Sequence, residues 1–246
     1  MKDSIITYKS PKDPISEAFR NMRTNITFAD IDEELRVLTI TSTGKGKGEG
    51  KSTIIANYAV ALAQSKKKVL LIDCDLRRPR IHRLFEQPNK RGLTNILLRE
   101  CEPTEAIQTT DVENLFMISS GPIPPNPSEI LASKRLIELI NQFKLAFDYI
   151  LIDAPPVGVV TDAAVLSHVT DGYIVVAAIS VTNKEGVRMA LETLRNVNGN
   201  IVGVVANNAP VSKRSGYYYY YSAYEEDQHQ SKKEKKHRKI KEKRGK

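Results

Sequence analysis

Arg36-Val-Leu-Thr-Ile-Thr41 is followed by a glycine- and lysine-rich segment that ends in Gly48-Glu-Gly-Lys-Ser-Thr53, and this stretch is the most informative one in the chain. A short apolar run such as the first predicts a buried β-strand, and residues 52–64 carry the pattern of a helix. Between a strand and a helix, the backbone N–H groups of a glycine-rich loop can surround phosphate. The stretch therefore predicts a phosphate-binding loop.

Two side chains of this loop carry its predicted chemistry. Lys51 is placed to neutralise the β- and γ-phosphate oxygens of a nucleotide, and the Ser52 hydroxyl is placed to bind Mg²⁺. Lys45 stands where the usual G-x-x-x-x-G-K-[ST] pattern has its first glycine, so the match is incomplete. A flexible basic turn is the alternative, but the strand before the loop and the helix after it favour nucleotide binding. The predicted nucleotide-binding residues of the loop are Gly48, Glu49, Gly50, Lys51, Ser52 and Thr53.

Apolar runs and helical patterns alternate along most of the chain. Strands are predicted at residues 69–73, 115–118, 149–153, 173–178 and 201–205, and helices at 93–99, 128–143, 163–168 and 184–197. Strands that are apolar on both faces and separated by helices form a mostly parallel sheet with helices on both faces. We expect one such α/β domain over residues 36–210.

Three aspartates lie at the ends of two predicted strands. Asp73 and Asp75 are spaced by two residues, which places them on the same side of the chain, and Asp153 ends another apolar run. The carboxyl ends of parallel strands are where α/β sheets bind ligands. One aspartate at a strand end can be only a turn former or a helix cap, but three beside a phosphate loop predict a site for Mg²⁺ and nucleotide.

Charge is distributed unevenly along the 246 residues. Residues 231–246 contain ten Lys or Arg and two Glu, and removing them from the chain's 37 basic and 29 acidic residues leaves 27 of each. This balanced body argues against a broad nucleic-acid-binding face. We expect residues 211–230 to be a tyrosine cluster followed by an acidic linker, and residues 231–246 to be a flexible, disordered basic tail.

Composition excludes several other classes of protein. No uninterrupted apolar run approaches the roughly 20 residues of a membrane span, and residues 1–13 lack the apolar core of a signal peptide. The two cysteines, Cys74 and Cys101, can form no disulfide framework and have no metal-binding spacing. We therefore expect a protein of the reduced cytoplasm.

Residues 1–35 are predicted to form an arm before the α/β domain. A helix expected at residues 15–28 carries Glu17, Arg20 and Arg23 at intervals of three, so the three side chains share a face. A face of mixed charge suits a complementary contact between subunits. These residues are the predicted oligomerisation site.

With these motifs the chain resembles the bacterial tyrosine kinases (BY-kinases) of capsule and exopolysaccharide systems, in their cytoplasmic Gram-positive form. That family is a branch of the P-loop NTPase fold close to the Min-type and partition ATPases. The matching motifs are Lys51-Ser52 (Walker A), Asp73-Cys-Asp-Leu-Arg77 (Walker A′), Asp153-Ala-Pro155 (Walker B), Glu17-x-x-Arg20-x-x-Arg23 (ring formation) and the proline-rich segment of residues 119–129.

The resemblance implies a protein-tyrosine kinase that depends on ATP and Mg²⁺. Its implied catalytic residues are Lys51, Asp73, Asp75 and Asp153, and its implied metal ligands are Ser52, Asp75 and Asp153. Asp73 is the candidate for orienting or deprotonating the incoming phenol. Asn207 falls where related ATPases hold the adenine.

A tyrosine-rich segment separates this chain from a plain ATPase. Six of the ten tyrosines lie within eight residues, at Tyr217, Tyr218, Tyr219, Tyr220, Tyr221 and Tyr224. The resemblance implies that the kinase autophosphorylates this cluster in trans, whereas an aggregation-prone aromatic strand is the alternative. The second candidate function is a non-catalytic Min- or partition-type ATPase switch, which would not need the cluster.

The resemblance also implies partners and a location. A membrane-anchored adaptor would activate the kinase and recruit it from the cytoplasm to the inner face of the cell membrane. Other implied partners are further copies of the chain in a ring, protein substrates, and a cognate tyrosine phosphatase. The basic tail suits contact with anionic lipid. Nucleic acid is not expected, because no aromatic or base-reading element accompanies the lysines.

Overall fold

The computed structural model describes residues 3–29, 35–44, 48–179 and 181–210. The chain divides into two units, Met1–Asn208 and Ala209–Lys246, and the first holds the sheet and its helices. The tyrosine cluster, the acidic linker and the basic tail lie outside the described residues, as do residues 45–47 of the glycine-rich loop. The division into segments 1–35, 36–210, 211–230 and 231–246 stays a prediction.

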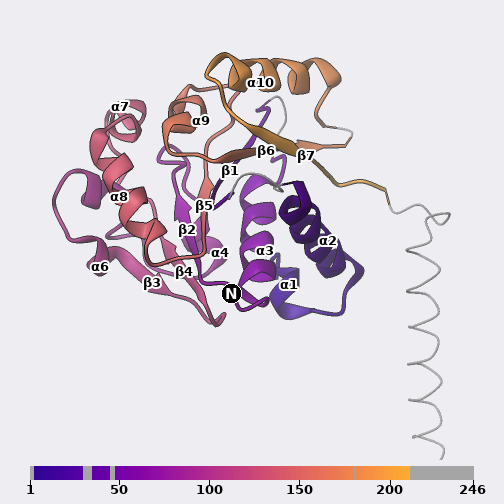
Figure 1. Cartoon of the computed structure of the whole chain (residues 1–246), viewed down its shortest axis with the longest axis horizontal. Helices are drawn as coiled ribbons and strands as arrows, with labels where there is room; N and C mark the ends of the chain where they lie inside the picture. The colour runs from indigo at the N-terminus through magenta and orange to yellow at the C-terminus, as the bar shows by residue number, and fades with distance from the viewer. Residues whose placement is uncertain (1–2, 30–34, 45–47, 180, 211–246) are drawn as a thin grey trace, which may run out of the picture. The chain divides into compact units, whose positions relative to one another are not determined.

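Seven strands form one sheet in the order β3-β4-β2-β5-β1-β6-β7 (Figure 1). All neighbouring pairs run parallel except β3 and β4 at one edge, which are antiparallel. The strands are β1 (Val37–Ser42), β2 (Val69–Asp73), β3 (Ile107–Thr109), β4 (Leu115–Ile118), β5 (Tyr149–Asp153), β6 (Gly172–Ala178) and β7 (Ile201–Asn207). The mostly parallel sheet predicted from the apolar runs is confirmed.

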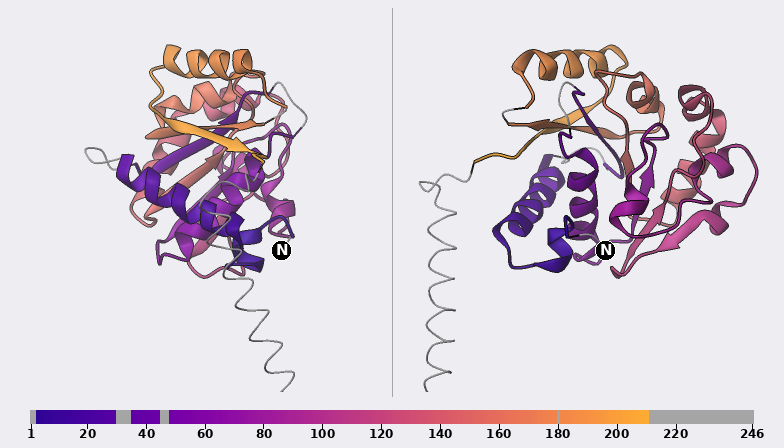
Figure 2. Two further views of the ribbon diagram at one scale, coloured as in Figure 1. Left: turned by 90° about the vertical axis from the view of Figure 1, so that its right-hand side faces the viewer. Right: turned by 180° about the vertical axis from the view of Figure 1, so that it is seen from behind.

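Helices cover both faces of this sheet, as the sequence predicts (Figure 1, Figure 2). One face carries α1 (Ile6–Lys9), α2 (Pro14–Ala29), α3 (Lys51–Ala63) and α4 (Ile81–Leu84). The other face carries α5 (Leu93–Leu97), α6 (Pro103–Ala106), α7 (Pro127–Leu131), α8 (Lys134–Lys144), α9 (Asp162–Val165) and α10 (Lys184–Asn196). Successive strand residues point to opposite faces, so Leu71 joins the core under α3 while Leu70 and Ile72 join the core under α8. Within the described residues, no helix has the length and apolar character needed to cross a membrane.

The structure differs from the sequence prediction in one divided helix and in several elements of three or four residues. The single helix predicted at residues 128–143 is two helices, α7 and α8, because Ser133 between them is extended, with φ −69° and ψ 145°. The edge strand β3 and the four-residue helices α1, α4 and α6 are not predicted. Elements of three or four residues are too short to show a periodic pattern.

A buried asparagine joins the N-terminal segment to α3. The Oδ1 atom of Asn57 accepts hydrogen bonds from the backbone N–H and from the hydroxyl of Thr7, each at 3.0 Å. Its Nδ2 atom donates to the carbonyl oxygens of Ser4 at 2.8 Å and Thr53 at 2.9 Å. Buried polar groups in native structures are satisfied in this way. The segment around α1 is thereby fixed to the helix that follows the phosphate loop.

Asn57→Ala should lower the free energy of unfolding by about 1–3 kcal/mol, because the buried backbone N–H of Thr7 would lose its acceptor and the Thr7 hydroxyl would keep only the backbone oxygen of residue 57. Urea unfolding followed by circular dichroism measures the change. The matched control is Asn141→Ala, which removes an exposed asparagine from α8 and should change stability by less than about 0.5 kcal/mol. Equal effects in the two variants would show that the Thr7 contacts add no stability.

Candidate active site

The residues predicted to carry the chemistry converge where strands β2 and β5 end. Asp73 and Asp153 are direct register partners across this parallel pair. Lys51, the first residue of α3, places its Nζ atom 2.6 Å from Asp153 Oδ1 and 3.5 Å from Asp75 Oδ2. The Ser52 hydroxyl donates to Asp153 Oδ2 at 2.7 Å. The structure therefore brings these five side chains together from the phosphate loop and two neighbouring strands.

Burial and charge act against each other at the Lys51–Asp153 ion pair. Burial disfavours the Lys51 ammonium, but the Asp153 and Asp75 carboxylates outweigh it and raise the pKa of the lysine. Burial also raises the pKa of Asp153, and the charge of Lys51 and the hydrogen bonds from Lys51 and Ser52 offset only part of this rise. Lys51 is therefore charged at neutral pH, as phosphate binding requires.

Asp73 is fully buried and braces the loop that follows β2. Its Oδ2 atom accepts hydrogen bonds from the backbone N–H groups of Arg80 and Ile81, both at 3.0 Å, and its Oδ1 atom accepts one from Asp75 at 3.2 Å. Burial and the nearby charge of Asp153 raise the pKa of Asp73 to about 8. The sequence predicts a role for Asp73 at the phenol but gives no sign of these three backbone contacts.

The turn into α3 depends on a glycine and on the asparagine that ends β7. Gly50 has a φ of +89°, and a Cβ atom there would lie 2.2 Å from Asn207 Nδ2. That Nδ2 atom donates to the backbone oxygen of Glu49 at 2.9 Å. Asn207, predicted to hold the adenine, is thus placed against the phosphate loop. Only glycine has both the backbone freedom and the small size that this position needs.

The Glu49 carboxylate is occupied by contacts inside the protein. It accepts hydrogen bonds from the hydroxyls of Thr43 and Thr182 and, at 2.7 Å, from the backbone N–H of Gly44. Burial alone would raise the pKa of Glu49, but these hydrogen bonds outweigh burial and lower it. Because its carboxylate is held by these donors, the group that Glu49 can offer to a phosphate is its backbone N–H. Nothing in the sequence marks Thr182 for this contact.

Arg77, the arginine of the D-x-D-x-R motif, joins three segments around the site. Its Nε atom lies 3.2 Å from both carboxylate oxygens of buried Asp162 in α9, and its Nη2 atom donates to Ser128 Oγ in α7 at 3.2 Å. The proline-rich segment of residues 119–129 therefore contacts the site through Ser128. The sequence motif predicts a role for Arg77 but does not predict its partners Asp162 and Ser128, although Asp162 comes soon after the Walker B match in the sequence.

The three residues of the predicted oligomerisation site lie on α2. Arg20 Nε is 2.5 Å from Glu17 Oε2, so these two side chains form an ion pair within the helix. Arg23 Nη1 instead donates to the backbone oxygen of Ala61 at 2.8 Å. Arg23 therefore also holds α2 against the last turn of α3, a contact that the spacing of the motif does not predict.

The oxygen atoms of the site suit magnesium bound together with a nucleotide. Ser52, Asp75 and Asp153 offer hard oxygen ligands of the kind that Mg²⁺ prefers. In the part of the chain that the structure describes, no group of three or more His, Cys, Asp or Glu side chains could hold a metal ion. Mg²⁺ usually keeps several waters and binds through one or two carboxylates plus substrate phosphates. The donor set therefore fits the metal in the presence of ATP.

Asp73 should make the stability of the protein fall as pH rises when nucleotide and Mg²⁺ are absent. Its carboxyl titrates at about 8 in the fold instead of near 3.8, so the native state holds an extra proton between these values. Its contribution is full below about pH 4 and is lost as pH rises toward about 8. Urea midpoints at about pH 5.5, 7 and 8.5 should decrease in that order, and less steeply in Asp73→Asn. Identical slopes in the two proteins would contradict the assignment.

Comparison with known proteins places the chain in a family. A family model described as an AAA domain matches residues 36–205. Tyrosine-protein kinase YwqD of Bacillus subtilis (strain 168) is 42% identical over 217 residues, which cover 88% of this chain and 91% of that protein. Tyrosine-protein kinase CpsD of Streptococcus agalactiae is 35% identical over 197 residues, which cover 80% of this chain and 83% of that protein.

Solved structures agree with the sequence relatives. The chimerical protein CapA2B2 superposes with a TM-score of 0.81 at 40% identity and covers 85% of this chain and 92% of its own. The septum site-determining protein MinD of Pyrococcus horikoshii, solved in complex with Mg-ADP, superposes with a TM-score of 0.61 at 26% identity, over 73% of this chain and 72% of its own. These likenesses confirm the P-loop NTPase type of α/β fold. In sequence and in fold alike, the chain belongs to the bacterial tyrosine-protein kinase family.

Proposed function

We propose that this bacterial tyrosine-protein kinase transfers the γ-phosphoryl group of ATP to tyrosine hydroxyls of proteins, itself included. The observation that carries the proposal is the buried Lys51 ammonium, held between Asp75 and Asp153 beside the phosphate loop. Lys51 offers the cation that a nucleoside triphosphate needs, and Asp75 and Asp153 offer oxygen ligands for its metal. These residues lie at the edge of the sheet where α/β proteins bind ligands.

The phosphate loop and Lys51 account for ATP binding. Backbone N–H groups at the start of α3 surround phosphate oxygens, and the Lys51 ammonium neutralises charge on the β- and γ-phosphates. An ammonium has three N–H donors, so Lys51 can contact phosphate and still donate to Asp153. Ser52, Asp75 and Asp153 would hold Mg²⁺, which when bound neutralises charge that develops on the transferred group.

Positioning of the acceptor phenol explains phosphoryl transfer to tyrosine better than deprotonation by a strong base does. A phenol has a pKa near 10, and Asp73, whose pKa is raised to about 8, is mostly protonated at neutral pH. We therefore assign Asp73 first to holding the loop that carries Asp75, and only its ionised fraction to accepting the phenol proton. Phosphoryl transfer through a loose transition state depends mainly on orientation and electrostatic stabilisation.

The tyrosine cluster, which lies outside the described residues, is the proposed acceptor. The twelve residues from Lys213 to Tyr224 span at most about 40 Å when extended. This length allows the cluster of one copy to reach a site in its neighbour. We propose that copies associate in a ring through the α2 face that carries Glu17, Arg20 and Arg23.

Family membership supports a role in capsule or exopolysaccharide synthesis. A membrane-anchored adaptor would activate the kinase at the inner face of the membrane, and a cognate tyrosine phosphatase would remove the phosphates. The basic tail of residues 231–246 would add attraction to anionic lipid, at up to about 1 kcal/mol for each Lys or Arg near the surface. These partners rest on the family and on charge alone.

A nucleotide-dependent switch of the Min type is the second candidate function. The likeness to MinD in complex with Mg-ADP favours it, since a switch needs the same phosphate loop and the same aspartates. The tyrosine cluster separates the two candidates, because a switch has no use for it. Formation of phosphotyrosine by the purified protein would support the kinase function over the switch.

Full-length protein incubated with Mg²⁺ and ATP should acquire phosphotyrosine, and an adaptor's cytoplasmic segment should raise the yield. Asp75→Asn and Lys51→Met should each lower labelling by about 100-fold or more, because both residues act on phosphoryl charge. Lys51→Met also removes the partner of buried Asp153, so thermal melting of both variants is the control for folding. ATP hydrolysis without phosphotyrosine in the wild-type protein would favour the switch.

Replacing all six cluster tyrosines by Phe should abolish labelling of the chain itself, because the proposed acceptors are gone. Transfer to an added peptide of residues 213–227 should continue, since the site is intact. Mass spectrometry of chain and peptide distinguishes the two outcomes. Labelling that persists elsewhere on the Phe-substituted chain would place the main acceptor outside the cluster.

Replacing Glu17, Arg20 and Arg23 together by Ala should convert the ring into monomers, as measured by light scattering at matched concentration. Arg23→Ala alone is the control, because Arg23 also contacts Ala61 of α3 and its loss costs about 1 kcal/mol of stability. An oligomer that survives the triple substitution would rule out this face as the subunit contact.

A further inference from the structure

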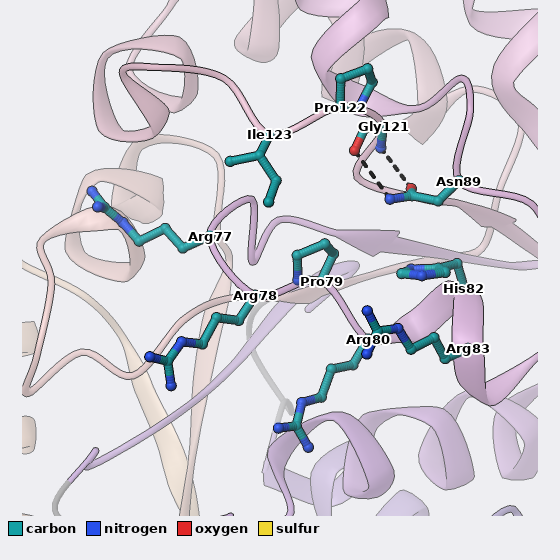
Figure 3. Close-up of a pocket in the computed structure, with 10 residues that line it drawn as sticks. All are labelled: Arg77, Arg78, Pro79, Arg80, His82, Arg83, Asn89, Gly121, Pro122 and Ile123. Atoms are coloured by element: carbon teal, nitrogen blue, oxygen red, sulfur yellow. Dashed lines mark hydrogen bonds between the residues drawn. The ribbon is translucent and has the colours of Figure 1, made fainter.

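A pocket of about 490 Å³ is formed in part by the residues that closely follow Asp73 and Asp75 in the chain, and four arginines line it (Figure 3). Arg77, Arg78, Arg80 and Arg83 come from the loop after β2 and from α4. Figure 3 shows the segment of residues 121–123 facing this loop across the pocket. The volume lies within the range of pockets that bind small molecules or single side chains.

Three of these arginines carry charge that the described part of the chain does not neutralise. Arg77 is paired with Asp162. For Arg78, Arg80 and Arg83, the hydrogen bonds to described residues are made by backbone atoms and none by a guanidinium group. His82 adds a buried Nδ1 atom without a hydrogen-bond partner among those residues. A concentration of unpaired cations in a concave surface attracts an anion.

The residues that line the pocket favour an anion that also carries an aromatic ring. Guanidinium groups bind phosphate through paired hydrogen bonds, and they stack on aromatic rings. Pro79, Pro122 and Ile123 add apolar surface, and Ile123 is 64% exposed. A phosphotyrosine offers both parts, a dianionic phosphate for the arginines and a flat ring for the apolar wall. A carboxylate side chain offers a single charge and no ring.

Two residues that line the pocket are hydrogen-bonded to aspartates of the candidate active site. The backbone N–H of Arg78 donates to Asp75 Oδ1 at 3.0 Å, and that of Arg80 donates to Asp73 Oδ2 at 3.0 Å. A group bound in the pocket is therefore close to the acceptor position. In an extended segment, side chains two residues apart share a side and lie about 7 Å apart. The run of five tyrosines at residues 217–221 supplies such pairs.

We propose that the pocket binds a phosphotyrosine that the kinase has already formed, on the tyrosine-rich segment of a second copy, while a nearby tyrosine occupies the acceptor position. The first phosphorylation then creates a binding group for the second, and the cluster is modified progressively. The inference rests on the proposed kinase function for the origin of its ligand. Binding of the ligand itself needs no catalysis.

Fluorescence anisotropy tests the binding step without turnover. The protein is the full chain with its six cluster tyrosines replaced by Phe, and the probes are peptides of residues 213–227 with phosphotyrosine, tyrosine or glutamate at position 219. We expect the phosphopeptide to bind at least about 10-fold more tightly than the other two. Equal affinity for the phosphorylated and unmodified peptides would overturn the proposal. Equal affinity for the phosphorylated and glutamate peptides would show that the pocket binds carboxylates, and would also overturn it.

A charge-matched pair of variants assigns the binding to the pocket. Arg78→Gln, Arg80→Gln and Arg83→Gln together should abolish the preference for phosphotyrosine. Lys12→Gln, Lys66→Gln and Lys67→Gln together remove the same charge from exposed positions outside the pocket and should leave the preference unchanged. A preference that survives the arginine substitutions, or that is lost in both variants, would place the binding elsewhere.

The distribution of phosphorylated forms tests the consequence for catalysis. With intact tyrosines and at equal total labelling, mass spectrometry should find multiply phosphorylated chains in the wild-type protein and mainly singly phosphorylated chains in the triple arginine variant. The same distribution in both would overturn progressive modification. A wild-type protein that forms no phosphotyrosine would instead contradict the proposed function, while the anisotropy result would still stand.

Discussion

The candidate site depends on one buried ion pair, between Lys51 and Asp153. The pair joins the first residue of α3 to the last residue of β5, and the Ser52 hydroxyl adds a second contact to the same carboxylate. Removing one partner of a buried pair costs about 3–5 kcal/mol, because the other charge is left unpaired. The charge that fixes the phosphate-loop helix to the sheet is also the charge that a phosphate would need. Stability and nucleotide binding therefore rest on the same atoms.

The other acidic residues around the site follow the same pattern, each holding a loop where chemistry is expected. Asp73 accepts three backbone hydrogen bonds from the loop after β2. Glu49 joins the two ends of the phosphate loop to Thr182, and Asp162 holds Arg77. Loops fixed in this way keep their functional groups in place without a ligand, which is the preorganisation that electrostatic catalysis requires.

The sequence predicts the parallel sheet well because strands buried on both faces are continuous apolar runs, as in Val69–Asp73 and Tyr149–Asp153. It also predicts that Lys51 and the strand-end aspartates meet, since the carboxyl ends of parallel strands share an edge. It cannot predict Thr182 as a partner of Glu49, because the two residues are 133 positions apart and Thr182 lies in no motif. The break at Ser133 is equally hidden, since the apolar pattern continues across it.

The net charge of the chain gives no sign of the arginine-lined pocket. The chain outside its basic tail is balanced, with 27 basic and 27 acidic residues, yet four arginines between positions 77 and 83 line one pocket. Unmodified tyrosines are neutral and feel little of this field, whereas each phosphate adds about −1.5 to −2 charges. The carboxylates of Asp75 and Asp153 would repel such a segment from the candidate site. The guanidinium groups of Arg78, Arg80 and Arg83 would attract its phosphate to the proposed pocket, so a phosphorylated segment would stay bound there while its next tyrosine reacts.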